Sequence, residues 1–279
     1  MKLCTFVDHD GLEGVGAVKG ERIYRLSGYA DMTGLIKNYN ADEIRRSLKH
    51  AKDIYAFEEV KFMAPVTKPG KMIFVGLNYR DHAEESNCPI PEYPILFSKY
   101  SNSLVGHGRN VIIPGMVSQC DFEAEFAFVV GKTAKNVHTE DAMNYVFGYT
   151  ICNDVSARDL QLRVSQWLYG KSVDTFAPMG PVITTADEIE NPHNLNISCR
   201  VNGMLRQKSN TRELIFNAAF LLSYISRAIT LEAGDIISTG TPAGVILAAK
   251  DPVWLKDGDV CEAEIEGIGV LRNIFVKEN

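Results

Sequence analysis

Residues Asp121–Val130 read DFEAEFAFVV, a pattern that predicts a β-strand buried on both faces. Side chains alternate across a strand, so one face carries phenylalanine, alanine and valine, and the other carries Glu123, Glu125, Ala127 and Val129. A buried carboxylate is costly unless it is paired or binds a metal ion, and two carboxylates on one face also repel each other. The stretch therefore predicts a divalent cation held by the two glutamates.

A second strand, predicted at Val260–Gly267, serves as a comparison because it carries glutamates at the same spacing. Its sequence VCEAEIEG places three glutamates on one face and Cys261, Ala263 and Ile265 on the other. One polar face and one apolar face are typical of a half-exposed strand, here followed by a hairpin at Gly267–Gly269. Spacing alone therefore does not indicate a metal site, and the apolar continuation of the first strand makes the difference.

The composition of the 279-residue chain limits its class and its partners. A net charge of -6 argues against nucleic-acid or anionic-membrane partners, which favour basic patches, and the sequence contains no such patch. Asp8 follows the start too early for the apolar core of a signal peptide, and no apolar run approaches transmembrane length. Six cysteines without a C-x-x-C pair favour reduced, packed thiols. We expect a cytoplasmic protein with no membrane or nucleic-acid partner.

Two prolines and a glycine in Lys61–Gly70 mark a domain boundary. Residues 1–65 contain strand-like pieces around glycines and a helical stretch near Ala41–Ala51, which predict a small N-terminal α/β domain. Residues 66–279 contain short apolar runs bounded by Gly, Pro or Asn, a pattern typical of a β-rich α+β domain. These runs are Met72–Val75, Ile95–Ser98, Phe122–Val130, Val146–Asn153, Leu195–Val201, Ile236–Ser238 and Val260–Val276.

One helix is predicted from about Thr211 to Ile229, where apolar residues recur at helical spacing. Asn210 and Glu213 have the spacing of a capping pair at its start. We expect this helix to pack in the core, and we assign it no chemistry.

A third carboxylate is expected beside Glu123 and Glu125, and Asp154 is the best candidate. An apolar strand ends there at Asn153-Asp154, and a carboxylate at the end of a strand is well placed to meet two others on a neighbouring strand. Oxygen ligands alone indicate Mg²⁺ or Mn²⁺. From spacing alone, a cap on the following turn or helix explains Asp154 equally well.

His82 and Glu85 stand three residues apart after the run that ends in Phe74-Val75-Gly76. On a helix they would be neighbours, so the histidine can act as a base and the glutamate can orient it. A surface histidine beside acidic residues explains the same pattern, and the spacing alone favours that reading.

Five blocks of the chain, in order from Lys71 to Val276, resemble the fumarylacetoacetate hydrolase family. Because five blocks match with suitable spacing, the resemblance is more specific than any one motif. The N-terminal 65 residues also resemble the small variable domain of the longer bacterial members. The blocks are VGLNYxDH at Val75–His82, DFExE at Asp121–Glu125, NDVSARD at Asn153–Asp159, KSxDTFxPxGP at Lys171–Pro181, and GDxIxTGTP at Gly234–Pro242.

The resemblance implies a fold, a metal site and a set of roles. The fold is a mixed β-sandwich or β-roll catalytic domain, usually in a homodimer, with Mg²⁺ or Mn²⁺ bound by three carboxylates. Carried over by motif position, the metal ligands are Glu123, Glu125 and Asp154, the general-base dyad is His82 with Glu85, the charge-stabilising lysine is Lys171, and the residues near the substrate are Arg158, Gln161, Thr241 and Lys99. A one-residue shift would exchange Glu85 for Glu84, and a lysine at the end of a strand explains Lys99 equally well.

The resemblance also implies hydrolysis of a carbon–carbon bond in a small 2,4-dioxo acid such as an acylpyruvate. In that reaction His82, oriented by Glu85, activates water, and Lys171 with Arg158 and Gln161 stabilises the oxyanion. Members of one fold differ in function, so the same metal site also fits an oxaloacetate-type decarboxylase, a 2-hydroxydienedioate isomerase or a ureidoglycolate-type lyase.

Overall fold

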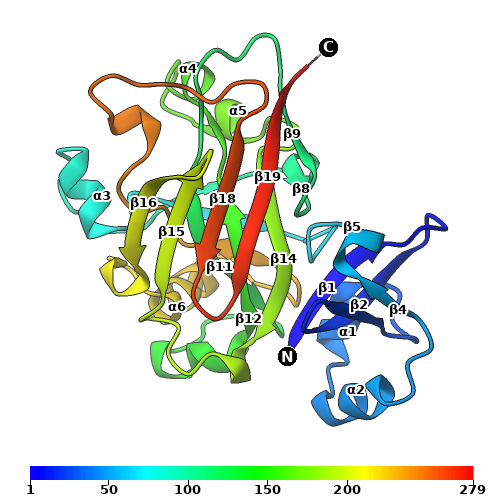
Figure 1. Ribbon diagram of the computed structural model, residues 1–279. Coiled ribbons are helices and arrows are strands. Elements are labelled where there is room, and N and C mark those ends of the chain that lie inside the picture. Colours follow the sequence, from blue (N-terminus) through cyan, green and yellow to red (C-terminus); the bar gives the residue numbers. More distant parts are fainter. Residues whose placement is uncertain (279) are drawn as a thin grey trace.

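A computed structural model describes residues 1–278, and in that part of the chain the strands form three sheets (Figure 1). The largest sheet has 12 strands and runs through the whole molecule. Its order is β4 (Ile54–Ala56), β3 (Arg22–Arg25), β2 (Glu13–Lys19), β1 (Lys2–Val7), β14 (Ala177–Thr185), β12 (Val146–Asn153), β11 (Ala124–Val130), β17 (Ile236–Ser238), β6 (Met72–Gly76) and β7 (Ile95–Ser98), with β5 (Lys61–Phe62) paired to β1 and β8 (Leu104–Val105) paired to β14.

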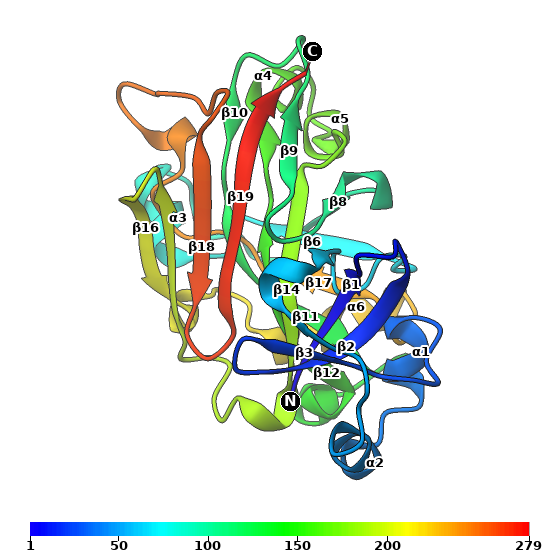
Figure 2. The ribbon, with the colours of Figure 1, turned by 45° about the vertical axis from the view of Figure 1, so that its right-hand side comes forward.

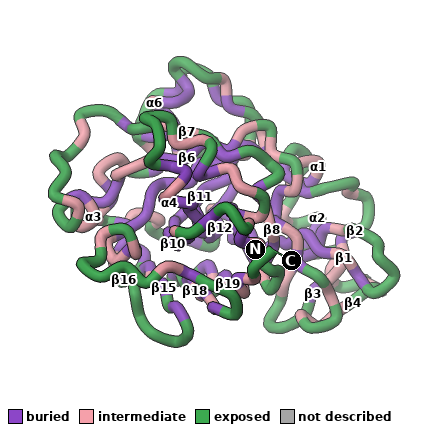
Figure 3. The backbone as a smooth tube through the Cα atoms, turned by 90° about the horizontal axis from the view of Figure 1, so that it is seen from above, coloured by how far each residue is buried: buried purple, intermediate pink, exposed green. Residues whose placement is uncertain are grey.

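A five-stranded sheet packs against this large sheet. Its order is β16 (Met204–Asn210), β15 (Asn196–Val201), β18 (Val260–Ile265), β19 (Gly269–Lys277) and β9 (Asn110–Ile113). Phe126 and Phe128 on β11 share one apolar core with Ile197, Ala263 and Leu271 of the smaller sheet. The sheet-rich α+β sandwich predicted from the sequence is therefore confirmed, and Figure 3 shows the buried strands at its centre and exposed loops at its rim.

Short helices connect and cover the sheets. They are α1 (Met32–Lys37), α2 (Ala41–Leu48), α3 (Arg80–Glu85), α4 (Arg158–Gln161), α5 (Leu168–Lys171) and α6 (Ala218–Ala228), with 3₁₀ turns η1 (Phe57–Glu59), η2 (Ser101–Ser103), η3 (Thr139–Tyr145), η4 (Ala186–Glu188), η5 (Thr211–Glu213) and η6 (Ile246–Ala248). A two-stranded ribbon of β10 (Cys120–Asp121) and β13 (Ser156–Ala157) lies beside α4. None of the helices in residues 1–278 is long and apolar enough to cross a membrane.

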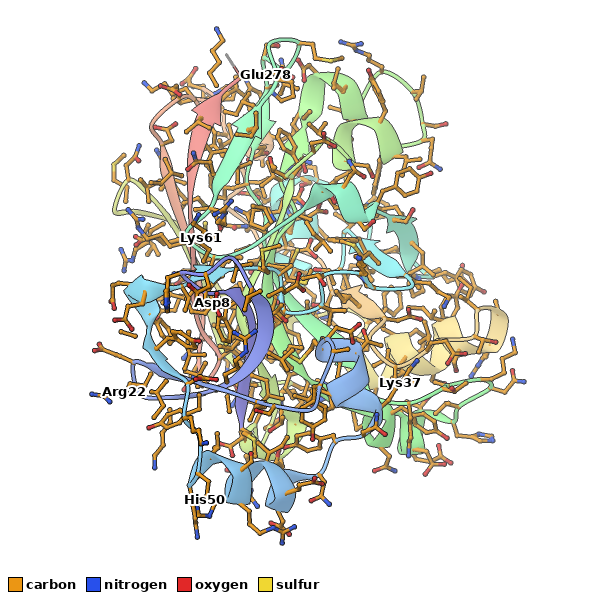
Figure 4. All side chains as sticks on the ribbon, turned by 90° about the vertical axis from the view of Figure 1, so that its right-hand side faces the viewer. Asp8, Arg22, Lys37, His50, Lys61 and Glu278 are labelled. Atoms are coloured by element: carbon orange, nitrogen blue, oxygen red, sulfur yellow. The ribbon has the colours of Figure 1, made fainter. Side chains whose placement is uncertain are left out.

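The N-terminal segment, residues 1–65, continues the large sheet (Figure 2). β1 pairs with β14 through Lys2↔Thr184 and Leu3↔Ile183, and Leu3 and Leu35 share an apolar cluster with Ala127 and Val129 of β11. Figure 4 shows Arg22 and His50 of this segment pointing away from the rest of the molecule. The segment thus buries the face of β11 that carries Glu125, while the domain boundary at residue 65 stays a prediction.

The strand predicted at Phe122–Val130 is confirmed over β11 and wrong at its start. β10 ends at Asp121, where it pairs with β13, and β11 begins at Ala124, where it pairs with β12. The backbone N–H of Glu123 donates instead to the side chain of Asn153 at 2.9 Å. Glu123 therefore lies in a break between two strands rather than on a continuous one.

The long helix predicted from Thr211 is also wrong at its start. Asn210 caps only the 3₁₀ turn η5, and α6 begins at Ala218 with Asn217 as its N-cap. A residue far away in the sequence explains the late start. Asn78 accepts a hydrogen bond from the N–H of Phe216 at 2.8 Å, so that N–H is not available to a helix beginning at Thr211. The half-exposed strand predicted at Val260–Gly267 is confirmed as β18, with its cysteine, alanine and isoleucine buried.

Candidate metal centre and active-site cavity

Three buried carboxylates, from Glu123, Glu125 and Asp154, offer oxygen atoms that lie within 4.8 Å of one another. Their side chains come from the break before β11, from β11 itself and from the end of β12. Asp154 donates its backbone N–H to the carbonyl of Glu123 at 2.8 Å, so the strand end brings the two carboxylates together. The capping alternative for Asp154 does not hold, because its carboxylate contacts lysines and the N-cap of α4 is Ala157.

Two buried lysines contact this group in different ways. The Lys99 ammonium donates to Asp154 Oδ1 at 2.5 Å and to the carbonyls of Val155 and Phe176 at 2.8 and 2.6 Å. All three of its N–H donors therefore point at protein oxygens. The Lys171 ammonium donates to Glu123 Oε2 at 2.8 Å and Asp154 Oδ2 at 2.7 Å, which leaves one N–H beyond its bonds to described residues.

Arg158 joins the group from the start of α4. Its Nη2 donates to Glu123 Oε1 at 2.6 Å, its Nη1 to Gln161 Oε1 at 2.9 Å, and its Nε to Asp121 Oδ2 at 2.9 Å. Burial alone would lower the pKa of Arg158, but the carboxylates of Glu123 and Asp121 raise it above its ordinary value. The guanidinium therefore stays charged and fixes three side chains in place.

The carboxylates differ in how well the protein compensates their charge. Burial favours the neutral form of Glu123, but the cations of Lys171 and Arg158 outweigh burial and lower its pKa to about 2. Burial raises the pKa of Glu125 well above its usual range, and the carboxylates of Asp154 and Glu123 raise it further. Glu125 accepts only from Ser238 Oγ at 2.5 Å and the N–H of Gly240 at 3.1 Å, both on Oε2, among the described residues.

This donor set fits a hard divalent cation. All three side chains supply oxygen, the ligand type that Mg²⁺ and Mn²⁺ prefer. Within residues 1–278 no cationic side chain contacts the Glu125 carboxylate, and a bound cation would stabilise its ionised form. The structure thus brings together the triad predicted from the sequence. Among the described residues, both donors to Glu125 bond Oε2, so Oε1 is the oxygen that a cation could bind.

Glu123 and Glu125 of the triad line a cavity of about 400 Å³. Part of its lining is polar and part is aromatic and aliphatic, where the ring of Trp167 meets Phe97 at 5.4 Å between centroids. The lining residues are Val75, Gly76, Leu77, His82, Ser86, Cys88, Ile95, Phe97, Glu123, Glu125, Arg158, Gln161, Leu162, Trp167, Lys171, Thr241 and Leu247. Asp154 and Lys99 lie behind the polar wall, where Asp154 accepts from both Lys99 and Lys171.

The pair His82 and Glu85 lies on α3, beside β16 (Figure 1). His82 Nδ1 and Glu85 Oε2 are 3.4 Å apart, and both oxygens of Glu85 accept the N–H of Gly244 at 3.0 Å. The histidine lines the cavity and the glutamate stands behind it. The contact and its position on the cavity wall favour the dyad over a surface histidine.

Thr241 is held in the Thr-Gly-Thr-Pro turn by two bonds. Its hydroxyl donates to the carbonyl of Ala124 at 3.0 Å and accepts from Gln207 Nε2 at 2.8 Å. Both partners are internal, so Thr241 meets the cavity at a fixed position.

Sequence reasoning missed several buried polar residues that hold this site. Gln207 on β16 also accepts the N–H of Ala124 at 3.0 Å, between the two metal-binding glutamates. The sequence blocks contain Asn153 and Asp121 without indicating a role for either, and the apolar run at Ser238 indicates only a strand. The sequence signal for these residues is a polar side chain inside an apolar run. Such a residue needs a hydrogen-bond partner when buried, but the pattern of one strand does not identify that partner.

A family model described as Fumarylacetoacetate (FAA) hydrolase C-terminal matches residues 71–276. The chain belongs to the fumarylacetoacetate hydrolase family. The matched residues include the triad, the dyad and the cavity, and they extend over the same range as the resemblance found in the sequence. Family membership identifies the chain as one of a group of enzymes.

Relatives within the fumarylacetoacetate hydrolase family carry several reaction names. A mitochondrial oxaloacetate tautomerase of Rattus norvegicus is 48% identical over 83% of this chain and 74% of its own length. The fumarylacetoacetate hydrolase of Exiguobacterium antarcticum has a TM-score of 0.89 at 37% identity, covering 100% of both chains. A 5-carboxymethyl-2-hydroxymuconate delta-isomerase of Mycobacterium smegmatis has a TM-score of 0.82 at 31% identity, also covering 100% of both.

Proposed function

We propose that this protein is a divalent-metal-dependent enzyme that moves a proton at C3 of a small 2-oxo acid, interconverting the keto and enol forms of an oxaloacetate-like substrate. The observation that supports the proposal is the arrangement of one cavity, where Glu123 and Glu125 of the buried carboxylate triad line the same space as His82, which Glu85 contacts from behind. Relatives named oxaloacetate tautomerase, at 46–48% identity over more than four fifths of the chain, favour this reaction among the family's several.

Glu123, Glu125 and Asp154 would hold Mg²⁺ or Mn²⁺. When bound, the cation would act as a Lewis acid toward the 2-oxo group and offset the negative charge of an enolate. Lys171, with one N–H not used by Glu123 or Asp154, donates to a substrate oxygen at the polar wall. Arg158 and Gln161 fix the same wall, and Thr241, whose hydroxyl proton is held by the carbonyl of Ala124, borders the substrate space by its fixed shape.

His82 carries the proton transfer. Its Nδ1 is engaged by Glu85, so Nε2 is the atom that takes the proton from C3. The C3–H bond breaks and its electron pair forms the C2=C3 double bond, while the π pair of the C2=O group moves onto the oxygen, which then takes the proton from His82 Nε2. Glu85, itself held by Gly244, orients the ring and stabilises the imidazolium that forms. Lys99, whose donors all point at protein oxygens, positions Asp154 rather than touching the substrate.

Hydrolysis of a carbon–carbon bond in an acylpyruvate-like 2,4-dioxo acid is the second candidate. The same dyad favours it, because a histidine oriented by a glutamate beside a cavity can activate water as readily as it removes a proton. Lys171, Arg158 and Gln161 would then stabilise the oxyanion. Decarboxylation of oxaloacetate, isomerisation of a hydroxydienedioate and a ureidoglycolate-type lyase reaction would use the same metal-binding carboxylates.

A substrate panel separates these reactions. We would assay acylpyruvates, oxaloacetate and dienedioates with Mg²⁺, Mn²⁺ or chelator, with metal-only controls for each substrate. The proposal expects metal-dependent acceleration of oxaloacetate tautomerisation that is lost in His82→Ala. Cleavage of acylpyruvates without any tautomerisation would make hydrolysis the function. Full metal-dependent turnover by Glu123→Ala would overturn the metal assignment, and tight binding without turnover on the whole panel would leave a binding protein.

We also propose a homodimer in the cytoplasm. An apolar groove of about 770 Å³ supports the dimer, because the exposed side chains of Tyr100, Met116, Val164 and Tyr169 line it. Light scattering on the purified protein would test the oligomeric state, and cell fractionation would test the location.

A further inference from the structure

Asp121 is a fully buried carboxylate whose two oxygens accept four hydrogen bonds and also form an ion pair with Arg158. Oδ1 accepts the N–H groups of Phe122 at 2.9 Å and Ile246 at 2.8 Å. Oδ2 accepts the N–H of Leu247 at 3.0 Å and Nε of Arg158 at 2.9 Å, and Nη2 of the same guanidinium lies 2.8 Å away as an ion-pair contact. Such a carboxylate does not need a metal ion, because the protein itself supplies its compensating charge and hydrogen bonds.

The partners of Asp121 lead to two different parts of the site. Arg158 extends from Asp121 to Glu123 and Gln161, which lie on the metal side. The segment Gly244–Ala248 extends to the dyad side, because its Gly244 holds both oxygens of Glu85 and its Leu247 lines the cavity. One side chain therefore connects the guanidinium beside the metal ligands to the backbone that orients the histidine.

We propose that Asp121 is a positioning residue that couples the His82–Glu85 dyad to the metal-binding side of the cavity. The inference rests on the proposed function, in which both sides act on one substrate. Asp121 fixes the distance between Arg158 and the Gly244–Ala248 segment. A substrate bound beside Arg158 then meets His82, whose partner Glu85 is held by Gly244. It also shares the charge of Arg158, so that Glu123 is not the sole anion facing that guanidinium.

Asparagine is the informative replacement at this position. It has the same shape, but one oxygen becomes an NH₂ group that faces donors instead of accepting from them. A matched control exists in the same domain. Asp235 is also a buried carboxylate with three donors, two from Lys71 and one from Glu232, and neither partner lines the cavity.

The test compares Asp121→Asn with Asp235→Asn in the full-length protein. Outer partners of metal sites typically change activity by about 10–100-fold, and we expect a fall in kcat of that size for Asp121→Asn with a smaller change in KM. Hydrogen exchange of the metal-free proteins should quicken at residues 244–248 in Asp121→Asn and not in Asp235→Asn. Unchanged exchange there, or equal losses of kcat in the two variants, would overturn the proposal.

A second variant covers the case in which Asp121→Asn does not fold. Ile246→Pro removes one N–H bonded to Asp121 at the first position of η6, after Val245 with an extended ψ of 154°, where proline is tolerated. Ala186→Pro, at the first position of η4 after Thr185 with a ψ of 151°, is its control. Ile246→Pro should lower kcat and quicken exchange around Gly244, and equality with Ala186→Pro would refute the coupling.

A double-mutant cycle with Glu85→Gln separates coupling from general damage. If Asp121 acts through the dyad, Asp121→Asn should lower kcat by a smaller factor in the Glu85→Gln protein than in the wild type. Asp235→Asn should lower kcat by the same factor in both backgrounds. Independent multiplication for Asp121 would contradict the proposal. If the wild-type protein turns over no 2-oxo acid, the proposed function fails, and exchange at residues 244–248 still decides whether Asp121 holds that segment.

Discussion

β11, with the break before it, and β18 carry glutamates at the same alternate spacing and give them opposite environments. β11 lies between β12 and β17 in the large sheet, the N-terminal segment covers one of its faces, and Glu125 is 1% exposed. β18 lies between β15 and β19, with one face in the core and the other open, so Glu264 is exposed. The layers that cover a strand, rather than its own sequence, decide whether its acids are solvated or reactive.

The charges around the two strands differ in the same way. Glu262 on β18 meets Arg272 at 3.5 Å, with 35% and 44% of the two side chains exposed. Glu123 meets Lys171 and Arg158 in the interior, and Glu125 meets only hydroxyl and N–H donors among the described residues. Water screens the first pair, while the second group depends on the protein or a bound cation for compensation.

Replacing Glu125 with glutamine should give the largest contrast between the strands. Loss of a metal ligand should lower metal-dependent turnover by more than the ~100-fold typical of outer partners. Saturating Mn²⁺ at 100 times its Kd should stabilise the wild-type protein by about 2.7 kcal/mol and leave Glu125→Gln unchanged. Calorimetric titration and thermal unfolding with and without Mn²⁺ would measure both effects.

Glu264→Gln is the matched change on β18. An exposed substitution should alter the free energy of unfolding by no more than about 0.5 kcal/mol and leave Mn²⁺ binding intact. If Glu264→Gln weakened Mn²⁺ binding as Glu125→Gln does, burial would not be what distinguishes the strands.

Lys171→Met should separate metal binding from turnover. Removing an ammonium that faces the substrate should lower kcat by about 10²–10³. Breaking two buried ion pairs should also destabilise the metal-free protein by roughly 3–5 kcal/mol, because Glu123 and Asp154 lose a partner. Mn²⁺ should still bind and restore much of that stability, since it replaces the lost positive charge. A variant that loses Mn²⁺ binding together with turnover would show that Lys171 organises the ligands instead.

Local patterns predicted most of strand β11 and offered Asp154 as a candidate, and the family resemblance completed the triad. Alternation places Glu125 on a face that continues into Ala127 and Val129, and the abrupt end of an apolar run marks Asp154. Both signals depend on residues within one or two strand lengths. The roles of the dyad and of Lys171 came instead from the family resemblance, because their spacing alone also fits surface residues.

Interactions between distant residues could not be predicted from such patterns. The break at Glu123 depends on Asn153, and the late start of α6 depends on Asn78, which is 138 residues from Phe216. Gln207 holds Ala124 from 83 positions away. A polar residue inside an apolar run signals that some partner exists, but only the folded sheet order shows which residue it is.

Glu262→Gln should give the smallest effect. The Glu262–Arg272 pair crosses β18 and β19 on their open face, and exposed pairs contribute about 0.2–1 kcal/mol, less in high salt. Urea unfolding at low and high ionic strength would measure the loss, which should vanish in 1 M salt. A salt-independent loss as large as that of Lys171→Met would mean that this face is buried in solution. Because residues 1–278 of one chain leave it open, a second copy would then have to cover it.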